Sequence, residues 1–124
     1  MRAVLFALLI CSPAVLSAQG AEAPRVIEVR LSNFDFSPSA IRLAAGRPVV
    51  LHLVNAGGGG HNFSAPQFFA AAANVSGPVR RGAVEVPGHG SVDIRLTPAR
   101  GTYRLRCTHT LHATFGMNGQ ITVQ

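Results

Sequence analysis

The chain has 124 residues, of which 48% are hydrophobic and only 13% are charged. This length suits a single domain, and the composition excludes a disordered chain and a large multidomain enzyme. The formal net charge is +6 at pH 7, and every basic residue is an arginine because the chain has no lysine. The arginines are spread along the chain, which predicts a solvated surface and no nucleic-acid partner.

The first twenty residues have the layout of a secretory signal. Arg2 precedes an unbroken apolar run over residues 3–10, and small residues follow at Ala18 and Gly20, where cleavage is expected. The run is much shorter than the roughly 20 apolar residues that a membrane-spanning helix needs. We therefore expect residues 1–20 to be removed, which leaves a periplasmic or secreted protein with no membrane span.

One cysteine remains once that signal is removed. Cys11 belongs to the signal, and the bulky Ile10 before it argues against a lipid-attachment site, so Cys107 is alone in the expected domain over residues 25–124. A single cysteine in an exported protein has no internal disulfide partner. Cys107 is therefore a metal ligand, a reactive thiol, an intermolecular link or a buried residue without a chemical role.

Hydrophobic alternation predicts several short strands along this domain. In residues 25–31, for example, Ile27, Val29 and Leu31 share one face and polar residues share the other. The apolar run FFAAAA predicts one or two turns of helix over residues 68–73. The other predicted strands cover residues 41–43, 48–55, 83–86, 92–96, 103–105 and 120–124.

Strands of this length, separated by turn residues at intervals of about ten, predict an all-β fold. We expect a Greek-key sandwich or barrel of seven to eight strands. Four glycines at residues 57–60 interrupt the pattern, and they predict a loop with little conformational preference of its own.

The segment over residues 102–123 carries most of the candidate chemistry. Strand alternation places Cys107 on the same inward face as Leu105, and His112 and Met117 follow at intervals of four intervening residues. The thiolate, the imidazole and the thioether are soft ligands, and together they suit copper, above all Cu(I), better than magnesium or calcium.

A trigonal copper site also requires a second imidazole, and His61 is the best candidate. It follows a buried strand and the four glycines, which allow a close backbone approach. His61, Cys107 and His112 would form a plane, and Met117 would be a long axial ligand, as in blue-copper sites. His109 is a possible alternative ligand. Alternate residues of a strand lie on the same face, so His109 would share a face with Cys107 if the strand continued.

These segments resemble the small cupredoxins, the family of plastocyanin, azurin and pseudoazurin. FDFSPSAIRLAAGRPVVLHLVNAGGGGHNF is similar to the first half of the family's sequence, and GTYRLRCTHTLHATFGMNGQITV is similar to its second half. The resemblance covers residues 25–124 and implies a site with one copper ion that cycles between Cu(I) and Cu(II). It further implies that Asn62 bonds to Thr108 and thereby supports the ligand geometry.

The resemblance implies a one-electron carrier between exported redox proteins. In this family the second histidine shows its ring edge through an apolar surface patch, which here implies His112 with Ala113 and Phe115. We expect a monomer with redox protein partners that dock near His112, and the positive charge favours acidic ones. The alternative is a copper-binding protein that buffers, delivers or senses copper, a role that His109 and the glycine loop favour.

The sequence argues against a copper enzyme. Multicopper oxidases and nitrite reductases have a similar motif, but they place a histidine directly before the cysteine to reach a second copper. Here that residue is Arg106. A binuclear copper site would need two cysteines in the loop, and the loop after Arg106 contains one.

Overall fold

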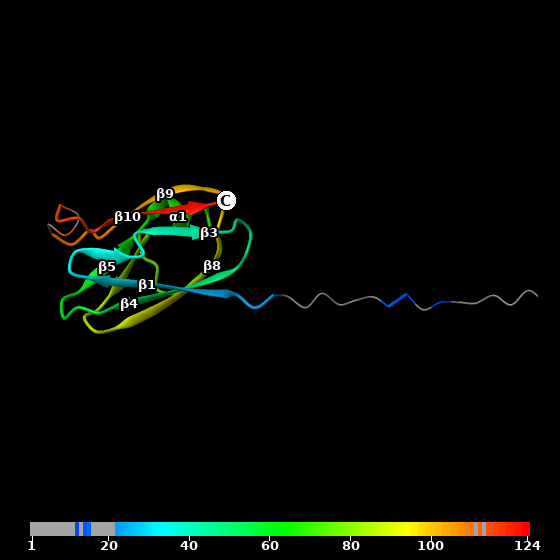
Figure 1. Ribbon diagram of the computed structural model, residues 1–124, viewed down its shortest axis with the longest axis horizontal. Coiled ribbons are helices and arrows are strands. Elements are labelled where there is room, and N and C mark those ends of the chain that lie inside the picture. Colours follow the sequence, from blue (N-terminus) through cyan, green and yellow to red (C-terminus); the bar gives the residue numbers. More distant parts are fainter. Residues whose placement is uncertain (1–11, 13, 16–21, 111, 113) are drawn as a thin grey trace, which may run out of the picture.

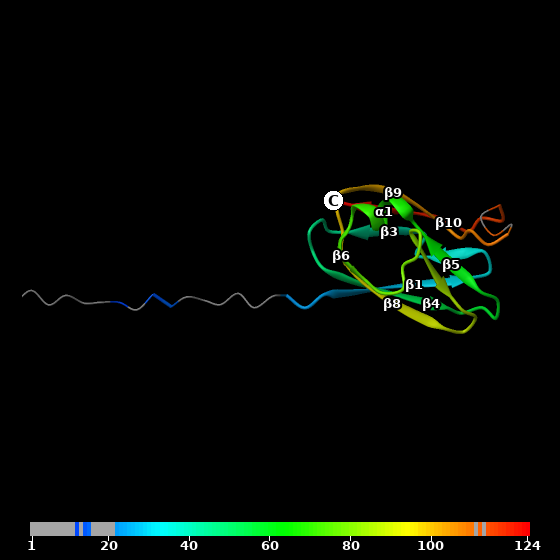
Figure 2. The same ribbon diagram turned by 180° about the vertical axis from the view of Figure 1, so that it is seen from behind.

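The structure is a computed structural model that describes residues 12, 14–15, 22–110, 112 and 114–124. These residues form two five-stranded β-sheets that pack face to face (Figures 1 and 2). The predicted all-β sandwich is therefore confirmed. The predicted signal falls on residues 1–20, of which only three are described, so it remains a prediction. No helix in the described part of the chain is long and apolar enough to cross a membrane.

The strand order is β2-β1-β4-β8-β6 in the first sheet and β3-β10-β9-β5-β7 in the second. β1 pairs with β4 and β3 pairs with β10 in parallel, and the other pairings are antiparallel. The chain passes repeatedly from one sheet to the other, which ties the layers together. The elements are β1 (Arg25–Ser32), β2 (Asp35–Ser37), β3 (Ala40–Leu43), β4 (Val49–Asn55), β5 (His61–Ser64), α1 (Pro66–Ala71), β6 (Ala73–Ser76), β7 (Ala83–Val86), β8 (Ser91–Thr97), β9 (Gly101–Arg106) and β10 (Asn118–Val123).

The described residues contain ten strands rather than seven or eight, and the three that the pattern misses show little usable alternation. All four residues of β5 are buried, all four of β6 are exposed, and β2 has only three residues. Alternation marks a strand only where one face is buried and the other is wet. The helix α1 begins two residues earlier than predicted, because Pro66 suits the first helical turn.

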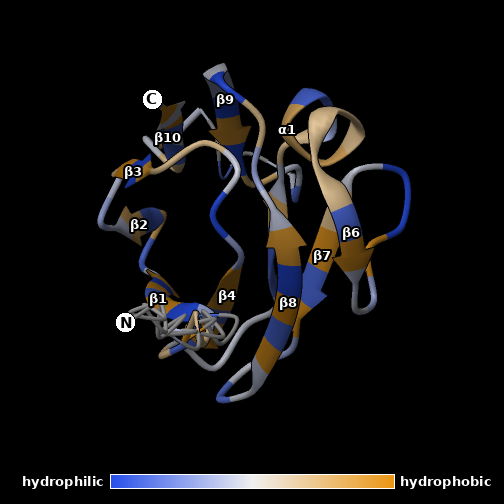
Figure 3. Cartoon of the chain, turned by 90° about the vertical axis from the view of Figure 1, so that its right-hand side faces the viewer, coloured by the Kyte–Doolittle hydropathy of each residue, from blue (hydrophilic) through white to orange (hydrophobic). Residues whose placement is uncertain are grey.

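The inward faces of the strands form one continuous hydrophobic core. Along β8, hydrophobic and hydrophilic residues alternate, as Figure 3 shows. Phe63 lies at the centre of the core, where its ring meets Phe36 and Phe69 edge to face. Phe36 was expected in the core and is buried, whereas Tyr103 is half-buried at the edge and donates its hydroxyl to the carbonyl of Ala99 at 2.9 Å. Such dense packing gives a rigid scaffold.

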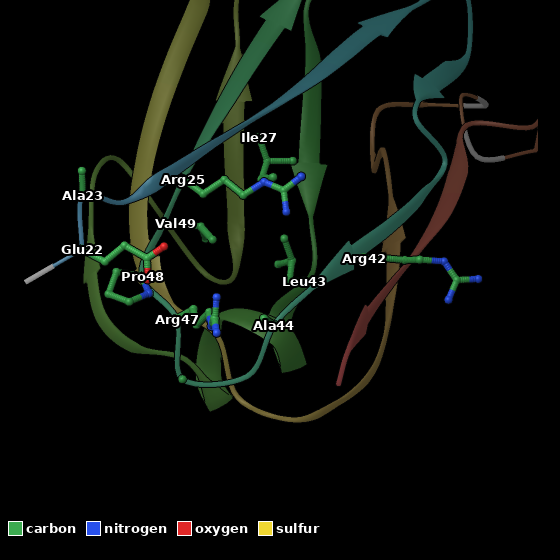
Figure 4. A pocket seen from close by; sticks show the side chains of 11 residues that line it. Glu22, Ala23, Arg25, Ile27, Arg42, Leu43, Ala44, Arg47, Pro48 and Val49 are labelled. Carbon is green, nitrogen blue, oxygen red and sulfur yellow. The ribbon is translucent and has the colours of Figure 1, made fainter.

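The two ends of the sandwich differ chemically. Where β1 and β4 begin, Arg25 and Arg47 stand over the aliphatic side chains of Ile27, Leu43 and Val49, which line a cavity of about 280 Å³ (Figure 4). Among the residues that line this cavity, only Glu22 carries a metal-ligating group, and a single carboxylate does not make a metal site. At the opposite end, where β1 and β4 finish, the loops β4–β5 and β9–β10 bring the predicted site residues together.

We expect Gly82→Ala to destabilise the fold more than Gly46→Ala. The two glycines have nearly the same left-handed φ, +73° and +74°. An alanine should therefore cost each about 1–2 kcal/mol in backbone strain. A β-carbon at Gly82 would also collide with the Cα of Pro66 at the start of α1, whereas at Gly46 it would meet nothing within 4 Å. Denaturant unfolding measures both losses, and equal losses would contradict the tight packing at Gly82.

Candidate metal centre

Three metal-ligating side chains converge at the end of the sandwich. His61 begins β5, Cys107 follows β9 directly, and His112 lies in the β9–β10 loop; their ligand atoms all lie within 4.8 Å of one another. His112 Nδ1 lies 3.1 Å from His61 Nδ1 and 3.3 Å from Cys107 Sγ. Three donors about 2.1 Å from one ion in a plane would lie roughly 3.6 Å apart. The donor spacing and the donor types therefore fit a single soft or borderline metal ion.

The β9–β10 loop brings Met117 back beside Cys107. The Cys107 N–H donates to the carbonyl of Met117 at 3.1 Å, and the Met117 N–H donates to the carbonyl of His112 at 3.0 Å. Met117 is completely buried. The backbone of Met117, the expected axial ligand, thus lies beside Cys107 at the base of the loop. That the Met117 thioether ligates a metal remains a prediction.

Asn62 connects the two segments that carry the candidate ligands. Its backbone N–H donates to the sulfur of Cys107 at 3.4 Å. Its side chain makes the contact expected with Thr108: Nδ2 donates to Oγ1 at 2.7 Å, and Oδ1 accepts the Thr108 N–H at 2.8 Å. The backbone of β5 is thus held directly beside the sulfur of the expected ligand.

His61 is buried, and its environment favours the neutral imidazole. Burial lowers the pKa of His61 below its ordinary value, and positive charge on His112 or His109 would lower the pKa further. A neutral ring offers a lone pair to a metal ion.

His109 lies beside the three ligand-type residues, but its Nε2 is engaged by a residue outside the group. Its Nε2 lies 2.8 Å from Oε2 of Glu85, and its ring centroid is 5.4 Å from that of His112. The alternation that made His109 an alternative ligand does not apply, because β9 ends at Arg106. The geometry thus favours His112 over His109 as the second imidazole. Glu85 itself is exposed and alternates with valines, so no local pattern marked it as part of this network.

The loop of glycines 57–60 is held in place by its neighbours. The buried amide of Asn55 donates to the carbonyls of Gly59 at 2.8 Å and Val86 at 3.0 Å, and it accepts the Gly57 N–H at 2.9 Å. The His89 N–H donates to the carbonyl of Gly57 at 2.9 Å. Four consecutive glycines have little conformational preference of their own, and hydrogen bonds to other parts of the fold therefore fix the conformation of this loop.

The candidate centre reaches the surface through an open depression of about 410 Å³. The ring of Phe34 meets His112 edge to face at a centroid distance of 4.9 Å, and Phe115 lies next to Phe34 at 5.5 Å. Both phenylalanines are exposed, so the expected apolar patch exists around Phe115. Ala113 lies outside the described residues. The pattern missed Phe34, whose left-handed φ of +62° falls in the β1–β2 turn.

Comparison with known proteins identifies the family. A sequence profile of the cupredoxin-like domain matches residues 1–123. The chain belongs to the cupredoxin-like family. A search of curated proteins gave no significant match.

Solved structures agree with this family assignment. Auracyanin B is 28% identical to this cupredoxin, with a TM-score of 0.63, and the match covers 83% of this chain and 91% of auracyanin B. Auracyanin A, a "blue" copper protein from Chloroflexus aurantiacus, is 21% identical with a TM-score of 0.61, over 82% of this chain and 100% of its own. At 21% identity that likeness shows the fold alone.

A multicopper oxidase shares the fold as well. McoA from Aquifex aeolicus is 16% identical with a TM-score of 0.61, and the match covers 92% of this chain but only 32% of the oxidase. The cupredoxin described here thus corresponds to about a third of that larger protein.

We expect Asn55→Asp to destabilise the fold and to loosen the glycine loop. A carboxylate cannot donate to the carbonyls of Gly59 and Val86, so two hydrogen bonds become repulsive contacts next to a buried charge. The free energy of unfolding should fall by about 2–4 kcal/mol. Denaturant unfolding and amide hydrogen exchange at residues 56–60 measure both effects. The exposed Asn33→Asp is the control, and equal effects from the two variants would contradict the structural role of Asn55.

Proposed function

We propose that this cupredoxin binds one copper ion and carries single electrons between exported redox proteins. The ion would be held by Nδ1 of His61, Sγ of Cys107 and Nδ1 of His112, and the Met117 thioether would be the fourth ligand. The observation that carries this proposal is the convergence of the first three donor atoms within 4.8 Å at the end of a rigid sandwich. A thiolate and two imidazoles exclude hard cations, and a thioether favours copper over zinc.

A copper ion in this site would supply the Cu(I)/Cu(II) couple, which gains or loses one electron. The chain holds the donors in place: β5 fixes His61, and a backbone hydrogen bond joins Cys107 to Met117. Because the two oxidation states prefer different geometries, donors held between those preferences reduce the movement that accompanies electron transfer.

His112 provides the path between this site and a redox partner. Its ring is partly exposed in the open depression and lies against Phe34. The exposed rings of Phe34 and Phe115 offer a partner an apolar contact from which water is excluded. Removal of residues 1–20, which include Arg2, would lower the net charge from +6 to +5, and this positive charge favours acidic partners. We expect the protein to be a monomer that is exported after removal of residues 1–20.

Copper buffering or delivery is the second candidate function. The open depression beside His61 and His112 would give an acceptor protein access to the ion. A carrier should show a reversible reduction potential and retain Cu(I) when a competing chelator is added, whereas a delivery protein should release Cu(I) readily. An enzymatic role is not proposed, because Arg106 stands where the related oxidases place the histidine that reaches a second copper.

Adding Cu(II) to the purified protein should produce an intense visible band from charge transfer between the Cys107 sulfur and copper. The Cys107→Ser variant should lose this band and still fold, because the fold is held by the strands. Absorption spectroscopy and far-ultraviolet circular dichroism measure the two properties. A colourless Cu(II)-loaded protein would overturn the proposed function.

The two histidines of the β9–β10 loop should respond differently to substitution. We expect His112→Ala to abolish or strongly shift the charge-transfer band, because His112 Nδ1 lies 3.3 Å from the Cys107 sulfur. His109→Ala should retain the band, since the His109 ring is directed at Glu85. The reverse pattern, measured by the same titration, would show that His109 is the ligand.

A further inference from the structure

Glu85 joins the two segments that hold the candidate ligands. In the antiparallel pairing of β5 and β7, Glu85 lies opposite Asn62. Its Oε1 accepts a hydrogen bond from Asn62 Nδ2 at 2.9 Å, and its Oε2 lies 2.8 Å from His109 Nε2. One carboxylate thus bonds both to the residue after His61 and to the loop after Cys107.

The contact with Glu85 determines which way the Asn62 amide points. A carboxylate accepts hydrogen bonds and donates none, so the NH₂ group of Asn62 must face Glu85. The carbonyl oxygen of Asn62 then faces the Thr108 N–H, and the second amide hydrogen reaches Thr108 Oγ1. The opposite orientation would place two acceptors together at Glu85 and two donors together at Thr108. The bonds between Asn62 and Thr108 are therefore aligned by a third residue.

The second oxygen of Glu85 holds the ring of His109. Without this contact, His109 would be a free imidazole three residues from His112 in the same loop, with ring centroids only 5.4 Å apart. The Glu85 carboxylate is charged at neutral pH: burial acts to raise its pKa, but the hydrogen bonds from Asn62 and His109 bring the pKa below its ordinary value. Both contacts are thus charge-assisted, which makes them stronger than neutral hydrogen bonds.

We propose that Glu85 is a positioning residue, which orients the Asn62 amide and keeps His109 away from the ligand atoms, so that His112 is the available imidazole. Its carboxylate also places a negative charge next to the site, which stabilises Cu(II) relative to Cu(I). The consequence for copper rests on the proposed function, whereas the positioning of the loop does not need the metal.

The first experiment uses the metal-free protein and measures amide hydrogen exchange. In Glu85→Ala, the Thr108 N–H should exchange at least about tenfold faster, because tenfold is the lower end of the range that corresponds to the loss of one charge-assisted hydrogen bond. Glu85→Gln should remain close to the wild type, because its amide oxygen accepts from Asn62 and its NH₂ group donates to His109. Unchanged amides in β1 and β4 would show that the fold is intact. Unchanged exchange at Thr108 in Glu85→Ala would overturn the proposal.

The first sheet provides a matched control, Asp93→Ala. His52 Nδ1 and Asp93 Oδ1 form a similar pair at 2.6 Å, and their side chains are 35% and 62% exposed, against 33% and 68% for His109 and Glu85. Asp93→Ala should leave the exchange of Thr108 unchanged. If the Thr108 N–H exchanged equally faster in Asp93→Ala, the effect would be a general destabilisation of the fold, and this result would also overturn the proposal.

The second experiment uses the copper-loaded protein and separates charge from position. Both Glu85→Gln and Glu85→Ala remove the negative charge, so both should raise the reduction potential. Only Glu85→Ala should change the charge-transfer band. A His109→Ala substitution should change the band again when it is added to Glu85→Ala, but it should leave the band of the wild type unchanged. An unchanged potential and band in both variants, with a blue wild type, would overturn the role of Glu85 and leave the proposed function standing. A wild type without the band would overturn the proposed function, and the exchange experiment would still decide the positioning role.

Discussion

The hydrogen bonds of Asn62 are the constraint on which the candidate centre depends. The residue lies in β5, 45 positions before the cysteine whose sulfur its backbone N–H contacts. Its side chain makes two bonds to Thr108 in the loop after that cysteine. Asn62 is buried, so the amide end of these bonds is shielded from water, although Thr108 itself is exposed. His61 and Cys107 are therefore held next to each other by their immediate neighbours in the chain.

The sandwich and much of the centre could be predicted because their signals are local. Alternation in a strand such as β8 reports one buried and one wet face, whereas the uniformly buried β5 gives no such signal. Cys107, His112 and Met117 lie in one short segment, so their spacing could be interpreted directly. His61 was more difficult, since only the preceding strand and glycines indicated it.

The residues that the sequence analysis missed act through contacts between distant segments. Glu85 lies between two valines in β7, as an ordinary exposed strand residue would. Only the pairing of β5 with β7 places it opposite Asn62. Asn55 ends a strand like many asparagines. Its two hydrogen bonds to the glycine loop and its third to the carbonyl of Val86 in β7 depend on the tertiary fold. Phe34 is exposed in the β1–β2 turn, where its backbone has a left-handed φ of +62°. None of these features has a periodic signal in the sequence.

The complete burial of Cys107 has a chemical consequence. Its sulfur has no exposed surface and lies beneath His112 and the backbone of Asn62. Oxidants, alkylating reagents and the thiols of other proteins must reach a sulfur atom directly in order to react with it. Burial in the folded chain therefore protects this thiol from oxidation, alkylation and disulfide exchange, whereas unfolding would expose it.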